Sequence, residues 1–128
     1  MVMTDPIADL IVQIKNAFMA KKDFVHVQFS KLKYEILKIF QEKGIVESFS
    51  KEESNKKSFL KIKLKYPQKY FEFKRISKPG RRIYVGYREI KPVKQGYGFG
   101  IISTPQGLMT EIEAKKKKIG GEYLIEVY

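Results

Sequence analysis

An alternating pattern runs through Ser58-Phe59-Leu60-Lys61-Ile62-Lys63-Leu64-Lys65-Tyr66, near the middle of this chain of 128 residues. Leu60, Ile62, Leu64 and Tyr66 occupy one set of alternate positions, and three lysines occupy the other. Successive side chains of a strand point to opposite faces. The pattern therefore predicts a strand over residues 58–66 with one apolar face and one solvated face.

An amphipathic helix is predicted near the N-terminus. Asp5-Pro6 is typical of a helix start, because Asp caps free backbone amides and Pro is favourable at the first helical position. The apolar residues that follow recur at the spacing of one helix face. They are Ile7, Leu10, Ile11, Ile14 and Phe18. The helix is expected to end before Lys21.

A second helix is predicted between two short strands. Its expected N-cap is Ser30 and its expected end is Gly44, and the strands cover residues 24–29 and 45–50. Residues 52–57 are predicted to form a polar turn before the strand at 58–66. The apolar side chains on the buried side of this helix are Leu32, Ile36, Ile39 and Phe40. The N-terminal module therefore has the predicted order helix, strand, helix, strand, strand.

The segment Tyr66-Pro67-Gln68 interrupts the pattern and is the predicted domain boundary. It separates an N-terminal α/β module, residues 1–66, from a β-rich C-terminal module, residues 67–128. In the second module, strands are predicted over residues 70–77 and 81–85. Between them, Lys78-Pro79-Gly80 is predicted to form a type II turn, and a loop is predicted over residues 91–98.

The rest of the C-terminal module contains one short helix. Residues 99–103 predict a buried strand, too apolar for a sheet edge, followed by a loop over residues 103–107. Thr110 is expected to open the helix, with Glu113 completing a capping box. Gly120-Gly121 is expected to stop the helix before a final strand over residues 122–128. The predicted fold class is α+β, with the C-terminal module the smaller of the two.

The basic residues are concentrated in one segment. The chain has 26 Lys and Arg against 14 Asp and Glu, a formal net charge of +12. Residues 56–94 hold 14 of the basic residues, including all four arginines, and only two acidic ones. Aromatic side chains are interleaved with these cations, a mixture that suits RNA or single-stranded nucleic acid. The alternative is a solvated Lys-rich surface around an aromatic core.

Few residues in the chain suit catalysis or metal binding. It has no cysteine and a single histidine, His26, which excludes thiolate and His-rich metal sites. His26 has no evident partner for acid–base chemistry. Glu111 and Glu113 lie two residues apart on a predicted helix, where they do not face each other. We therefore expect no enzyme, no metal, no cofactor and no small-molecule substrate.

No membrane association is expected. No apolar run approaches the ~18 residues of a membrane-spanning helix, and the N-terminal residues lack the pattern of a secretory signal.

The predicted loop at residues 103–107 is a candidate binding element. It is expected to join a buried strand to a capped helix, so that the hydroxyls of Ser103 and Thr104 and the helix N-terminus would offer donors to phosphate, ribose or base edges. An ordinary strand-to-helix turn is the alternative. The residues alone leave both interpretations open.

Four blocks of sequence occur in a distinctive order. They are Asp5-Pro6-Ile7-Ala8-Asp9, Arg75-Ile76-Ser77-Lys78-Pro79-Gly80-Arg81-Arg82-Ile83-Tyr84, Gly98-Phe99-Gly100-Ile101-Ile102-Ser103-Thr104-Pro105-Gln106-Gly107-Leu108-Met109-Thr110 and Ile119-Gly120-Gly121-Glu122. In this order and at these spacings, the chain resembles the bacterial S-eight family of small-subunit ribosomal proteins. The resemblance covers nearly the whole chain, with about residues 47–73 unspecific.

The resemblance implies a two-module fold and a structural role in the small ribosomal subunit, in the cytoplasm. It implies direct binding to the central domain of 16S rRNA during assembly of the subunit platform, with the S-five and S-twelve proteins as neighbours. In the family, the Ser-Thr loop enters a distorted RNA helix. The RNA-binding residues implied here are Ser103, Thr104, Gln106, Gly107, Gly121, Glu122, Tyr84, Ser30, Lys31, Thr4 and Asp5, with Arg81 and Arg82 of the basic middle turn.

The chain departs from the family at the loop. Pro105 stands where the family usually has a third hydroxyl residue, and Gln106 where a basic residue often follows. We hypothesise that Pro105 stiffens the loop and lowers its ordering entropy. Glu122 is also unusual for an RNA site, since carboxylates repel phosphate. It would either accept hydrogen bonds from base amino groups or a ribose hydroxyl, or pair with a lysine of the preceding helix.

Two other functions compete with the ribosomal one. A free-standing RNA-binding translational regulator would use the same basic surface. An RNA-processing enzyme is disfavoured because the chain has a lone His26, no cysteine and no clustered acidic metal site.

Overall fold

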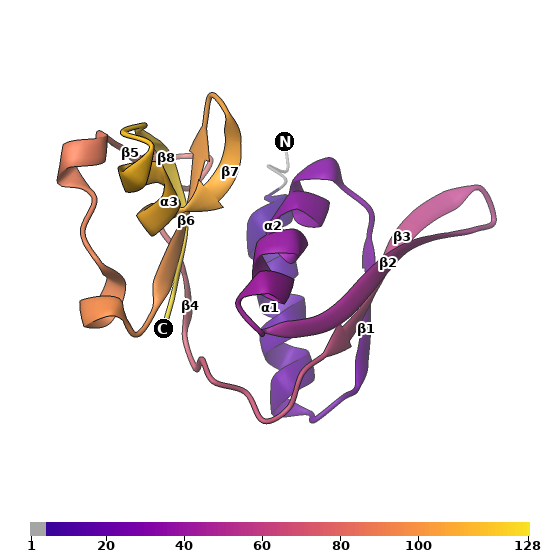
Figure 1. Ribbon diagram of the computed structural model, residues 1–128. Coiled ribbons are helices and arrows are strands. Elements are labelled where there is room, and N and C mark those ends of the chain that lie inside the picture. The colour runs from indigo at the N-terminus through magenta and orange to yellow at the C-terminus, as the bar shows by residue number, and fades with distance from the viewer. Residues whose placement is uncertain (1–4) are drawn as a thin grey trace. The chain divides into compact units, whose positions relative to one another are not determined.

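The computed structural model describes residues 5–128, which divide into two compact units. One unit is Pro6–Lys69, and the other is Tyr70–Tyr128 together with Asp5. Each unit combines α-helix with an antiparallel sheet (Figure 1), which confirms the predicted α+β class. The domain boundary between residues 66 and 67 stays a prediction.

Both helices of the first unit form where the sequence predicts them, although Phe18 and Leu32 are only half-buried and Ala17 and Leu37 are buried in their place. Helix α1 is Pro6–Met19 and helix α2 is Lys31–Glu42. Ser30 caps α2 as predicted, because its side chain accepts a hydrogen bond from the Lys33 amide at 3.2 Å. Gly44 follows α2 with a φ of +82°, a left-handed conformation that glycine adopts without strain. The residues that α1 buries are Ile7, Leu10, Ile11, Ile14 and Ala17.

The sheet of this unit has three antiparallel strands in the order β1-β3-β2. They are β1 (Phe24–Gln28), β2 (Val46–Ser54) and β3 (Lys57–Leu64). Leu60, Ile62 and Leu64 are buried as the alternation predicts, whereas Tyr66 lies beyond the end of β3. The predicted polar turn is too long: only Asn55 and Lys56, both with positive φ, separate β2 from β3.

The second unit has a five-stranded antiparallel sheet. Its strands are β4 (Phe73–Arg75), β5 (Tyr84–Val85), β6 (Phe99–Thr104), β7 (Gly107–Thr110) and β8 (Gly121–Val127). The order is β4-β8-β6-β7, and β5 also pairs with β8. Strand β6 therefore lies inside the sheet, as its apolar sequence predicts, and Ile101 and Ile102 are fully buried.

Several predicted boundaries in this unit are corrected. The strand predicted over residues 70–77 is only three residues long, although the amides of Ile76 and Ser77 still donate to β8 carbonyls. Residues 78–81 form a tight turn, but Gly80 lies outside the left-handed region. A type II turn needs a positive φ at that position, so the predicted turn type is wrong. Two 3₁₀ turns, Tyr87–Glu89 and Val93–Gly96, occupy the region around the predicted loop.

The segment after β6 differs most from the prediction. Strand β7 intervenes between the turn and helix α3 (Glu111–Lys116), so that the turn joins two strands of a hairpin rather than a strand and a helix. Thr110 caps α3 as predicted, accepting from the Glu113 amide at 3.3 Å. The helix ends at Lys116, and Gly121 belongs to β8 instead of stopping the helix.

Candidate nucleic-acid interface

One row of paired residues crosses the sheet of the second unit where β6 ends and β8 begins (Figure 1). Ser103 of β6 pairs with Glu122 of β8, and Glu122 pairs on its other side with Tyr84 of β5. Directly paired residues of neighbouring strands place their side chains on the same face of a sheet. The register thus brings together three residues that are far apart in the sequence.

The side chains of this row differ in exposure. Tyr84 is 69% exposed, whereas the Glu122 side chain is 18% exposed and Ser103 is half-buried. The Ser103 hydroxyl has no hydrogen-bond partner within the described part of the chain. An exposed aromatic ring and a hydroxyl group, on one face of the sheet and on either side of Glu122, can stack on a base and hydrogen-bond to RNA respectively.

The turn between β6 and β7 is organised by the Thr104 side chain. Its Oγ1 donates to the Gly107 carbonyl at 2.8 Å and accepts from the Gln106 amide at 3.1 Å. A hydroxyl has one proton, so Thr104 has no donor left for a ligand. Pro105, Gln106 and Gly107 are exposed at the tip. The expectation that both hydroxyls of this segment, aided by a helix N-terminus, offer donors is therefore corrected to Ser103 and the turn backbone.

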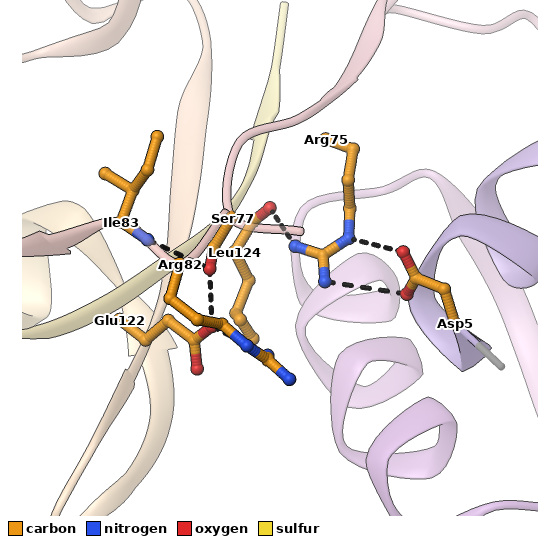
Figure 2. Close-up of polar contacts among 7 residues, drawn as sticks. All are labelled: Asp5, Arg75, Ser77, Arg82, Ile83, Glu122 and Leu124. Atoms are coloured by element: carbon orange, nitrogen blue, oxygen red, sulfur yellow. Dashed lines mark hydrogen bonds and ion pairs between the residues drawn. The ribbon is translucent and has the colours of Figure 1, made fainter. Parts of the chain in front are cut away.

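A basic loop, residues 78–82, reaches the row through Arg82, whose side chain meets Glu122 (Figure 2). Two backbone hydrogen bonds of 2.9 Å between Lys78 and Arg81 close it. Lys78, Arg81 and Arg82 are all exposed. The Arg82 Nη1 is 3.0 Å from Oε2 of Glu122, which ties the loop to the row. The loop and the row together form what we call the candidate interface.

Glu122 has a role that neither sequence interpretation foresaw. Its Oε2 accepts hydrogen bonds from the Ser77 hydroxyl and from Arg82, and the lysines of α3 are not among these partners. Desolvation is the largest single influence and raises the pKa of Glu122. The hydrogen bonds from Ser77 and Arg82 and the positive charges of Arg82 and Arg75 together outweigh it, so the pKa is lowered from its ordinary value.

Acid should weaken the second unit through this carboxylate. A carboxyl group whose pKa is lowered by folding stabilises the fold above its ordinary pKa, and the contribution is lost as the pH falls through the lowered value. We expect Glu122→Gln to lower the Tm by about 5 °C at pH 7. The difference from the wild type should shrink as the pH falls below about 4. Thermal unfolding followed by circular dichroism across pH 3–7 measures it, and a constant difference would contradict the assignment.

The remaining predicted residues lie elsewhere. Asp5 forms an ion pair with Arg75 at 3.4 Å, and Arg75 also donates to the Leu124 carbonyl at 2.9 Å (Figure 2). Ser30 and Lys31 belong to the first unit, at the start of α2. Thr4 is outside the described residues.

Comparison with known proteins identifies the family. The sequence model described as Ribosomal protein S8 matches residues 5–128. The chain belongs to this family.

The relatives that the chain matches include proteins named Small ribosomal subunit protein uS8 from several bacteria. The protein from Porphyromonas gingivalis is 44% identical over 131 residues, covering 98% of this chain and 100% of the relative. The protein from Erythrobacter litoralis is 42% identical over 131 residues and covers all of both chains. The protein from Thermus aquaticus is 41% identical over 137 residues, covering 98% of this chain and 99% of the relative.

Ribosomal protein S8 is a family of ribosomal proteins, and the comparisons indicate no catalytic family. Among residues 5–128, no group of three or more His, Cys, Asp or Glu side chains is arranged to hold a metal ion. No helix in the same residues is long and apolar enough to cross a membrane.

Sequence reasoning missed two features of the candidate interface in this S8 chain. Ser77 stood inside a matched block without a role, because nothing local shows that it meets Glu122 45 residues away. Strand β7 was missed because its turn lacks the Asn-Gly or Asp-Gly pair that marks most two-residue hairpins. The sequence feature that could have indicated this hairpin was Gly107, three residues after Thr104, which adopts a φ of +111°.

Proposed function

We propose that this protein is a structural component of the small ribosomal subunit, located with it in the cytoplasm. In this proposal it binds the central domain of 16S rRNA directly and helps to assemble the subunit platform, beside the S-five and S-twelve proteins. The observation that carries the proposal is the candidate interface. There, the exposed Tyr84 and the Ser103 hydroxyl share a row with Glu122, and Glu122 holds a loop with three exposed cations.

The geometry supports different roles for different residues of the candidate interface. Arg81 and Arg82 would neutralise phosphates and position the protein, which gives affinity without sequence information. Tyr84 would stack on an unpaired base, and Ser103 would hydrogen-bond to a base or ribose. Gln106 and Gly107 would present the hairpin tip to the RNA.

Six predicted residues would contribute differently. Gly121 would act by letting β8 approach β6 closely, and Glu122 by holding Arg82, rather than by direct contact. Ser30 and Lys31 at the α2 start would form a separate backbone contact, and Thr4 and Asp5 remain weaker candidates of that kind.

The proposal is tested by binding to a short hairpin from the 16S rRNA central domain, with a scrambled hairpin alongside, across a salt series. The wild type should prefer its hairpin by about 10³-fold or more. A Ser103→Ala/Thr104→Ala double variant should lose mainly this preference and keep the salt dependence, because the loop cations that release counterions are unchanged.

Two results would contradict the proposal. If the wild type bound both hairpins with equal affinity and the same steep salt dependence, binding would depend on charge alone. The candidate interface would then not recognise a specific RNA. Failure to co-sediment with washed small subunits, despite specific hairpin binding, would favour a free-standing translational regulator.

A further inference from the structure

The basic loop leaves and rejoins the sheet at a single residue of β8. The Ser77 amide donates to the Tyr123 carbonyl at 3.0 Å, and the Tyr123 amide donates to the Ile83 carbonyl at 2.9 Å. Residues 78–82 therefore project from a narrow neck. The backbone of β8 fixes the two ends of this loop, but it does not by itself fix the direction of the arginine side chains.

A buried hydroxyl lies at this neck (Figure 2). Ser77 is 0% exposed. Its Oγ donates to Oε2 of Glu122 and accepts from the Ile83 amide at 3.1 Å. Because a hydroxyl offers one proton and two lone pairs, this one group joins the start of the loop, its end and the carboxylate that holds Arg82.

We propose that Ser77 is a positioning residue for RNA binding, a role that rests on the proposed function. It touches no RNA in this proposal. Its hydroxyl orients the Glu122 carboxylate, the carboxylate orients the Arg82 guanidinium, and the guanidinium meets a phosphate in a fixed geometry. A guanidinium held in place before binding loses less freedom on binding than a mobile one, so the contact is stronger.

The arrangement also accounts for a carboxylate inside a basic surface. Glu122 places one negative charge close to Arg82, at 3.0 Å, while its own side chain is only 18% exposed. Most of the carboxylate is thus turned away from solvent, and the exposed side of the pair is the arginine, 51% exposed. A phosphate that binds here would therefore contact the oriented Arg82 guanidinium and little of the Glu122 carboxylate.

A double-mutant cycle tests the chain of contacts with the same hairpin RNA. Ser77→Ala and Arg82→Ala should each weaken binding by about tenfold and lower the salt slope by about one unit. In the Arg82→Ala background, Ser77→Ala should cost less than about twofold more, because the group through which it acts has gone. Equal losses from Ser77→Ala in both backgrounds would overturn the proposal.

A matched control separates positioning from general destabilisation. Thr110 is also buried, 8% exposed, and its hydroxyl accepts one backbone amide in the same unit. Thr110→Ala should lower the Tm by a few degrees, as Ser77→Ala should, yet leave hairpin affinity and salt slope unchanged. Comparable RNA losses in both variants would show that Ser77 acts only through stability, which also overturns the proposal.

Hydrogen exchange in the free protein makes the test independent of the proposed function. Ser77→Ala should speed exchange of the Ile83 amide and of the basic loop by about tenfold or more, while the amides of β6 stay protected. Unchanged exchange would overturn the positioning role whatever the RNA result. Faster exchange in a protein whose wild type shows no hairpin preference would instead place the failure in the proposed function.

Discussion

Gly121→Ala is expected to destabilise the second unit strongly. A Cβ built on Gly121 overlaps the Ser103 carbonyl oxygen and lies 2.9 Å from the Ser103 carbonyl carbon and 3.1 Å from the Thr104 Cα. These are backbone atoms of an interior strand, so they cannot move aside as a flexible side chain would. β8 would have to separate from the end of β6.

The expected loss is about 3 kcal/mol or more of unfolding free energy, at the upper end of overpacking effects. That corresponds to a fall in Tm of about 10–20 °C for a unit of this size. Hairpin RNA binding should fall in parallel, since Ser103 and Glu122 would no longer share a row. Differential scanning calorimetry and the hairpin titration measure the two effects.

Gly80→Ala is the matched control. A Cβ on Gly80 meets nothing within 4 Å, and its φ lies outside the left-handed region. This variant should change the Tm by no more than 2–3 °C, about 0.5 kcal/mol, although Gly80 stands in the basic loop. If Gly121→Ala were equally harmless, the close approach of β8 to β6 would be wrong.

The first unit was the more predictable of the two from sequence. Its elements are long and each carries a local signal: the helical spacing of Ile7 to Ile14, the Ser30 cap and the alternation of Leu60, Ile62 and Leu64. Periodicity and caps act within a few residues, and burial against the rest of the unit agrees with them. The structure changes only the ends of these strands.

The second unit was less predictable because its strands are short. β5 has two residues and β4 has three, too few to show alternation. Their positions depend on pairing with β8, more than 35 residues away along the chain. The resemblance suggested candidate residues without their internal contacts. Thr104 and Glu122 are held by internal hydrogen bonds, whereas the Ser103 hydroxyl has no internal partner among the described residues.

Ser103 and Thr104, adjacent residues with similar chemistry, should respond differently to removal of their hydroxyls. Thr104→Val keeps the shape of a side chain that is 9% exposed but removes both hydrogen bonds that hold the turn. We expect a loss of about 1–3 kcal/mol in unfolding free energy, because the Gln106 amide and the Gly107 carbonyl lose their partner. RNA preference should fall by about 10–100-fold as the hairpin tip becomes mobile.

Ser103→Ala should show the opposite balance. No internal hydrogen bond is lost among the described residues, so the unfolding free energy should change by less than about 0.5 kcal/mol. Hairpin affinity should still fall by about tenfold, because a hydrogen bond to the RNA is removed. Urea unfolding and hairpin binding of the two variants give the comparison. If the Ser103→Ala variant kept its RNA preference, Ser103 would not contact the RNA directly. The RNA would then contact the turn that Thr104 organises, rather than the Ser103 side chain.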